Sequence, residues 1–149
     1  MRNKLKDVKK GISLLEVMVS LLILSLILAS LLSICNMNYR ASLLRQQKEK
    51  AARIVYCLQQ EIKYNYSLEE VVANLQAGDL QLKASENFLD NLIYQDVFAM
   101  ESGPDIEIRL LGENEDSAEI NIKIEKSFKG LNILEEKTFI KDRYMNECY

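Results

Sequence analysis

The sequence predicts an α+β protein in which a long N-terminal α-helix, apolar enough in its first half to span a membrane, packs on a small C-terminal antiparallel β-sheet. Three observations lead to this fold class. The 23 residues Val17–Tyr39 contain no charge, and about 20 apolar residues suffice to cross a bilayer. Apolar residues then recur at helical spacing as far as Ile62, and strict alternation of apolar and polar residues follows Pro104.

The helix is expected to run without interruption from about Ser13 to Tyr64, because no capping or breaking signal separates the apolar run from residues 40–64. These later residues are rich in good helix formers. Their apolar positions are spaced by seven, four, three and four residues, which places them on one helical face: Leu44, Ala51, Val55, Leu58 and Ile62. A coiled-coil seam is the alternative, but the stripe is short and irregular, which favours packing against a sheet of the same chain.

The middle of the chain predicts short helices. Ser67 and Glu70 have the spacing of a capping box. A helix over about 68–77 is therefore expected, and Gly78 is its natural stop. Residues 85–94 predict a second helix, although Leu92–Met100 could equally form a strand.

The C-terminal part predicts an antiparallel meander after the turn at 102–105. Alternation marks strands at 106–110 and 120–125, and a weaker one at 136–141, with turns at 112–116 and 129–132. One face of this sheet is polar, so the other must be covered, and the helical stripe is the obvious cover.

Charge and composition exclude several functions. Residues 1–11 hold five basic residues and one acid, so removing them leaves 14 basic and 21 acidic residues and a net charge of −7. An acidic domain is not expected to bind nucleic acid, because phosphate binding depends on clustered Lys and Arg. Basic residues before the apolar run place the N-terminus in the cytoplasm and the bulk of the chain outside.

The sequence offers no catalytic machinery, so we expect neither an enzyme nor a cofactor or metal site. It has no His, the commonest general base and metal ligand. Adjacent acids such as Glu69 and Glu70 point to different helix faces and make poor acid/base partners. Cys57 and Cys148 would both be exported, where disulfides persist. Either they pair, which would tie the tail to the long helix, or they are two free thiols.

The N-terminal edge carries the most specific motif, Lys9-Lys10-Gly11-Ile12-Ser13-Leu14-Leu15-Glu16. A short basic leader ends at Gly11, and a single glutamate stands at the head of the apolar helix. This edge resembles the cleavage region of type IV pilins and pseudopilins, and the run 14–20 looks most like minor pilins and minor pseudopilins of the PilV and GspI kind. Two features depart from the family pattern: Ile12 takes a place usually held by Phe, and no Pro or Gly interrupts the helix before Gly78.

The resemblance implies that a prepilin peptidase cuts between Gly11 and Ile12 and methylates the new amine of Ile12. Glu16, the fifth mature residue, would then pair with that amine in its own or a neighbouring subunit and set the assembly register. The implied partners are major and minor pilins or pseudopilins, the peptidase, the membrane and an inner-membrane assembly platform. The implied location is a single-pass membrane protein that later joins a surface filament for adhesion or motility, secretion or DNA uptake.

The chain is therefore expected to consist of a leader peptide, a helix for the membrane and filament core, and a soluble domain. The leading hypothesis is a minor pilin or pseudopilin that initiates or caps a type IV pilus-like filament. The alternative is an uncleaved bitopic membrane protein with a small extracytoplasmic binding or sensor domain. The boundaries are 1–11, 12–39 and 40–149, and the soluble domain comprises a helix (40–64), a variable region (65–103), the meander (104–143) and a tail (144–149).

Overall fold

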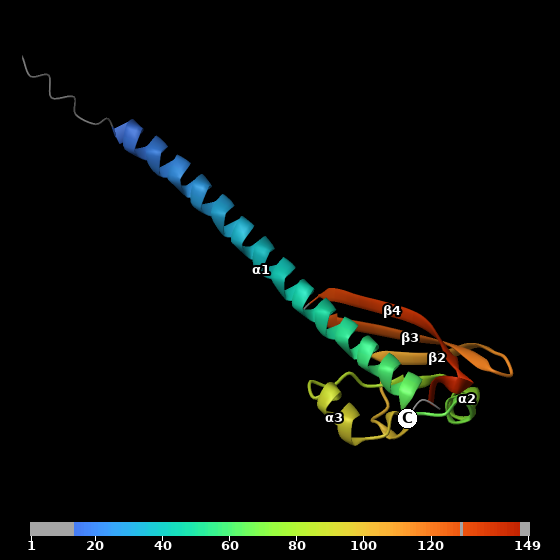
Figure 1. The fold of residues 1–149 in the computed structure, drawn as a ribbon. Helices are drawn as coiled ribbons and strands as arrows, with labels where there is room; N and C mark the ends of the chain where they lie inside the picture. Colours follow the sequence, from blue (N-terminus) through green and yellow to red (C-terminus); the bar gives the residue numbers. More distant parts are fainter. Residues whose placement is uncertain (1–13, 129, 147–149) are drawn as a thin grey trace, which may run out of the picture. The chain divides into compact units, whose positions relative to one another are not determined.

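The computed structural model describes residues 14–128 and 130–146. Contacts divide the chain into two compact units, with the boundary between Ser42 and Leu43. The elements, coloured along the sequence in Figure 1, are α1 (Leu14–Tyr64), α2 (Leu68–Gln76), β1 (Leu80–Leu82), α3 (Phe88–Tyr94), η1 (Val97–Ala99), β2 (Ile106–Glu113), β3 (Ser117–Phe128), β4 (Leu131–Asp142) and η2 (Arg143–Asn146).

The long helix is confirmed, since α1 runs from Leu14 to Tyr64. In its first part, as far as Ser42, every described side chain is exposed. Among the described residues α1 is the one helix long and apolar enough to cross a membrane, and none of its most apolar window is buried. This part of α1 therefore presents apolar side chains to its surroundings on all sides.

The sheet is antiparallel throughout, with the strand order β1-β2-β3-β4. In the register of the two central strands, Ile108 lies opposite Ile122 and Glu107 lies opposite Lys123. The alternation in the sequence thus places apolar residues on one face of the sheet and polar residues on the other. The apolar face of β3 consists of four buried residues, Ala118, Ile120, Ile122 and Ile124.

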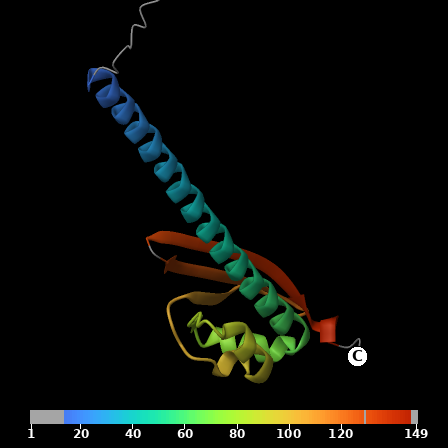
Figure 2. The same ribbon diagram turned by 90° about the vertical axis from the view of Figure 1, so that its left-hand side faces the viewer.

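The predicted cover of this sheet is also confirmed. Figures 1 and 2 show the strands lying beside the part of α1 that follows Leu43. The stripe residues of this part are buried in one core with the sheet, and Leu58 and Ile62 are wholly inaccessible. Leu44, at the start of the stripe, is only partly buried. Apolar burial of this kind is the main stabilising term of the unit.

Helix α2 begins at the capping box predicted from sequence. The Ser67 hydroxyl accepts a hydrogen bond from the Glu70 amide (3.2 Å), and the Glu70 carboxylate accepts one from the Ser67 amide (2.9 Å). Two amides that have no partner inside the helix are thereby satisfied. Leu68 and Val72 then pack on Ala118, in a second, smaller apolar cluster.

The strands are longer than the alternation predicted. β2 continues to Glu113, so the turn expected at 112–116 is confined to 114–116, and the Asn114 amide bonds the Ser117 carbonyl at 2.8 Å. β4 begins at Leu131 instead of residue 136. The expected turn at 129–132 therefore ends before Leu131, and Gly130 within it has a φ of +76° that favours glycine.

The region before Pro104 contributes a strand that the alternation did not reveal. β1 pairs with β2, so the sheet is not confined to 104–143. The segment after η1 also pairs antiparallel with the end of β1, through a bridge between Leu82 and Ser102, and a Cβ on Gly103 would lie 2.6 Å from the Cβ of Lys83. Glycine is therefore needed at 103. The strand alternative for 92–100 is wrong, because α3 and η1 occupy these residues.

Tyr66, just after the end of α1, contacts residues 96–98 through hydrogen bonds and a ring contact. Its hydroxyl donates to Asp96 Oδ1 (2.9 Å) and accepts from the Val97 amide (3.0 Å). Its ring makes an edge-on contact with Phe98, with the centroids 5.1 Å apart. Burial is the main cause that raises the pKa of Tyr66 to about 12, and the neighbouring Asp96 raises it further.

Replacing Tyr66 by Phe should remove both hydrogen bonds and keep the ring contact, at a cost of about 1–2 kcal/mol of unfolding free energy. The folded pKa lies above the ordinary value of 10.0. The stabilisation linked to this proton is therefore complete below pH 10 and is lost as the pH rises through about 12. Tyrosinate absorbance should show one late-titrating phenol in the wild type that Tyr66→Phe lacks. If the variant lacks only an ordinary phenol, the hydroxyl is not bound as described.

Candidate functional site

The predicted processing and assembly residues lie at the start of α1. Gly11 and Ile12, the predicted cleavage pair, lie outside the described residues. Glu16 lies in the first turn of α1, and its side chain is exposed. A carboxylate in the first turn is favoured by the partial positive charge of the helix N-terminus.

Glu16 is the one charged residue between Leu14 and Tyr39. Three serines of this segment form hydrogen bonds within the helix: the Ser20 hydroxyl donates to the Glu16 carbonyl (2.7 Å), and Ser25 and Ser30 likewise donate to carbonyls one turn earlier. Such local bonds let a hydroxyl enter an apolar environment at low cost. In the described ranges, no hydrogen bond or ion pair reaches the Glu16 carboxylate.

Glu16 also borders an open hollow on the surface of α1. The hollow is otherwise lined by Val17, Ser20, Leu21 and Leu24. The carboxylate therefore stands at the edge of an apolar surface that another helix could cover. An unpaired charge becomes costly when such a surface loses contact with water, which creates a demand for a cationic partner.

The predicted cysteine pair is not tested by the structure. Cys57 is partly buried beside the main core. Cys148 lies outside the described residues. The disulfide between them stays a prediction.

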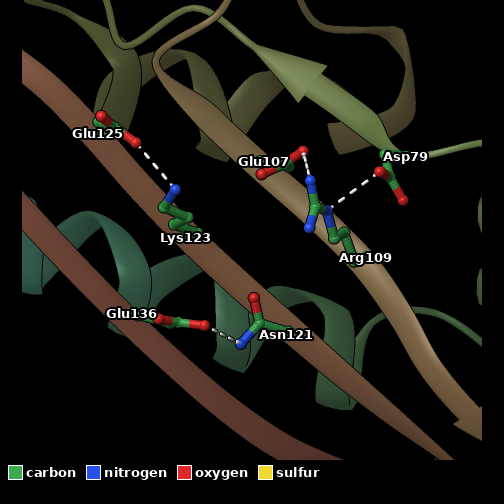
Figure 3. A network of polar contacts seen from close by, with 7 residues as sticks. All are labelled: Asp79, Glu107, Arg109, Asn121, Lys123, Glu125 and Glu136. Carbon is green, nitrogen blue, oxygen red and sulfur yellow. Dashed lines mark hydrogen bonds and ion pairs between the residues drawn. The ribbon is translucent and has the colours of Figure 1, made fainter.

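The polar face of the sheet carries ion pairs (Figure 3). Arg109 bonds Glu107 and lies 3.0 Å from Asp79, while Lys123 bonds Glu125 at 2.8 Å and lowers its pKa. Figure 3 shows α1 behind the strands, on the other face of the sheet. Within 14–128 and 130–146, no group of three or more His, Cys, Asp or Glu side chains could hold a metal ion.

Sequence reasoning missed Lys141, which is wholly buried. Its Nζ donates to the carbonyl of Lys63 at 2.9 Å, in the last turn of α1, where carbonyls lack partners inside the helix. Burial lowers the pKa of Lys141, while the charges of Glu69 and Glu70 oppose that shift. Its position on the inward side of β4, opposite Ala118, was the signal that could have revealed it.

Comparison with known proteins identifies the N-terminal edge. The family model described as the prokaryotic N-terminal methylation motif matches residues 6–32. The matched range contains Gly11, Ile12 and Glu16. No curated protein and no solved structure matches the chain. The chain thus carries a motif of the type IV pilin type on a helix-and-sheet fold that is pilin-like, and the motif and the apolar helix together indicate a membrane-anchored protein.

Proposed function

We propose that the protein is a minor pilin or pseudopilin, a structural subunit that initiates or caps a type IV pilus-like filament. The observation that carries the proposal is the coincidence of two features at one place. The methylation motif covers residues 6–32, and within that range one carboxylate, that of Glu16, stands unpaired on an apolar helix among the described residues. No chemistry performed by the chain itself is needed for this role.

Processing would create a partner for the Glu16 carboxylate, which has none among the described residues. Cleavage after Gly11 by a prepilin peptidase frees the amine of Ile12, and the same enzyme methylates it. Ile12 and Glu16 are four residues apart, which is about one helical turn. The amine of the same subunit or of its neighbour can therefore reach the carboxylate.

Assembly would then bury this pair between packed apolar helices. In a low-dielectric environment a separated charge is strongly disfavoured, so a helix docked in the wrong register would leave Glu16 unpaired. Packing of the apolar surfaces supplies the association, and the ion pair selects the register. Other pilins or pseudopilins and an inner-membrane platform are the partners that this mechanism requires.

Removing the Glu16 charge should abolish assembly without affecting processing. We expect Glu16→Leu and Glu16→Gln to be cut and to stay in the membrane, but to cross-link to partner pilins at least about 10-fold less than the wild type, since a lost buried ion pair costs several kcal/mol. Ser20→Ala is the matched control, one turn further along the same helix, because its hydroxyl bonds only a backbone carbonyl in the structure.

Equal cross-linking by Glu16→Leu and the wild type would refute the register mechanism. Loss of cross-linking in Ser20→Ala as well would show that this helix surface, rather than the charge, governs docking. Glu16→Gln separates charge from shape, because it keeps the size of the side chain.

A further inference from the structure

A short basic segment, Arg45–Arg53, lies at the start of the soluble unit. It holds four basic residues, Arg45, Lys48, Lys50 and Arg53, and one acid, Glu49, for a net charge of +3. Residues 54–149 hold 9 basic and 19 acidic residues, for a net charge of −10. The soluble unit is therefore acidic after residue 53 and has a positive segment at its start.

The four cations of the basic segment are all exposed. None of them joins an ion pair with any described residue. Four cations elsewhere do have carboxylate partners: Lys83 lies 2.7 Å from Glu101, Lys123 lies 2.8 Å from Glu125, and Arg109 and Arg143 are also paired. The charges of the basic segment are thus available to a partner outside the described chain.

The arrangement of these cations on α1 indicates what kind of partner fits. Viewed down the axis of α1, with 3.6 residues per turn, neighbouring side chains of these four cations are at most about 80° apart, with one exception. One gap between them is wider. That gap holds the stripe of Ala51 and Val55, which is buried against the sheet. The cations therefore cover the whole free circumference of the helix. A docking protein contacts one side of a helix, whereas lipid headgroups surround a membrane helix.

The basic segment also lies close behind the uncharged run. Arg45 comes six residues after Tyr39, and Arg40 adds another cation between them. Membrane orientation does not account for this charge, because the positive-inside rule places excess Lys and Arg on the cytoplasmic flank, which here is the leader. Clusters of basic residues beside a membrane helix attract anionic lipid.

We propose that the basic segment binds the headgroups of anionic phospholipids in the leaflet on the side of the soluble unit. The inference rests on the membrane-spanning helix of the proposed function, and it adds a ligand that the pilin role does not require. Headgroup binding holds the start of the soluble unit at the membrane surface before filament entry. A subunit entering the filament has to release these lipids.

The test compares the full chain in phosphatidylcholine bilayers that contain phosphatidylglycerol, with spin-labelled versions of both lipids. We expect the wild type to select labelled phosphatidylglycerol about five-fold or more, the preference that one well-placed cation supplies. The triple variant Arg45→Gln, Lys48→Gln, Lys50→Gln should lose most of it. The control Lys83→Gln, Lys123→Gln, Lys137→Gln removes the same charge from other elements and should keep it.

Salt gives a second prediction for the same samples. Raising NaCl from about 0.1 to 1 M shortens the screening length from about 10 to 3 Å and should weaken the selectivity of the wild type far more than that of the triple variant. The leader is identical in all samples, so its own charges cancel in the comparison.

Equal selectivity of the wild type and the basic-segment variant would overturn the proposal, and so would an equal loss in the control variant. If the basic-segment variant keeps its lipid preference but no longer cross-links to a partner pilin, the surface is a protein interface and the proposal is wrong. Cleavage after Gly11 is measured separately. An uncut chain that still selects phosphatidylglycerol through this segment refutes the processing role alone.

Discussion

Replacing Ile122 by Asp should unfold the soluble unit. Ile122 is wholly buried on β3, opposite Ile108 and under α1. The change removes a core side chain and puts a carboxylate in its place, at a cost of about 4 kcal/mol or more, against a total stability of ~5–15 kcal/mol for a typical domain. Circular dichroism of the full chain in detergent should show loss of the strand signal, while the apolar helix persists.

Ile140→Asp is the matched control, because it makes the same substitution on the other face of the sheet. Ile140 is 56% exposed on the edge strand β4. Its partner across the ladder is Glu119, so the new charge should cost at most about 1 kcal/mol through like-charge repulsion. Similar destabilisation by both variants would contradict the assignment of the two faces.

Replacing Gly11 by Val should block removal of the leader. A branched side chain beside the scissile bond would displace that bond in the peptidase site, and a displacement of about 1 Å can cost about 100-fold in rate. Processing by a cognate prepilin peptidase, followed by the mass of the intact chain, measures the effect. The uncut variant should also lack the methyl group on Ile12, because the amine is never freed.

Gly112→Val serves as the control for that experiment. Gly112 lies in β2, and a Cβ added there would meet no atom within 4 Å. The same substitution at this distant site should leave cleavage at the wild-type rate. Normal cleavage of Gly11→Val would show that the enzyme does not read Gly11, and the predicted cut site would be wrong.

Much of the fold could be predicted from sequence because its signals are periodic and local. The stripe ending at Ile62 shows which side of the long helix is apolar, and the alternation around Ile122 shows which face of the sheet is apolar. Together they predict that the helix covers the sheet. The capping box at Ser67 is similarly local, since both of its hydrogen bonds join residues three apart in the chain.

The features that sequence reasoning missed depend on contacts between distant residues. β1 has three residues and no clear alternation, and it exists because β2 offers it an edge. β4 is long because its pairing with β3 continues through charged as well as apolar residues. The pairing extends as far as Leu131, which lies opposite Phe128. Lys141 lies 78 residues along the chain from the carbonyl that it binds, and no local sequence pattern predicts such a bond.

For the candidate site, the sequence carries most of the information and the structure adds less. Gly11, Ile12 and Glu16 belong to a linear motif that the family model matches within residues 6–32, so the sequence alone carries it. The structure adds the surroundings of Glu16, an exposed carboxylate on an apolar helix in which Ser20, Ser25 and Ser30 bond backbone carbonyls of the same helix. The basic segment was visible in the sequence as well, but that its cations lack carboxylate partners among the described residues became evident only from the structure.

The N-terminus of the mature chain is the most direct test of the central claim. The full chain is produced with and without a cognate prepilin peptidase, and the terminal residue is determined by mass spectrometry. We expect a chain that begins at Ile12 and carries one methyl group on its amine when the peptidase is present, and a chain that retains the leader when it is absent. A chain that still begins at Met1 in the presence of the active peptidase would contradict the pilin-like role.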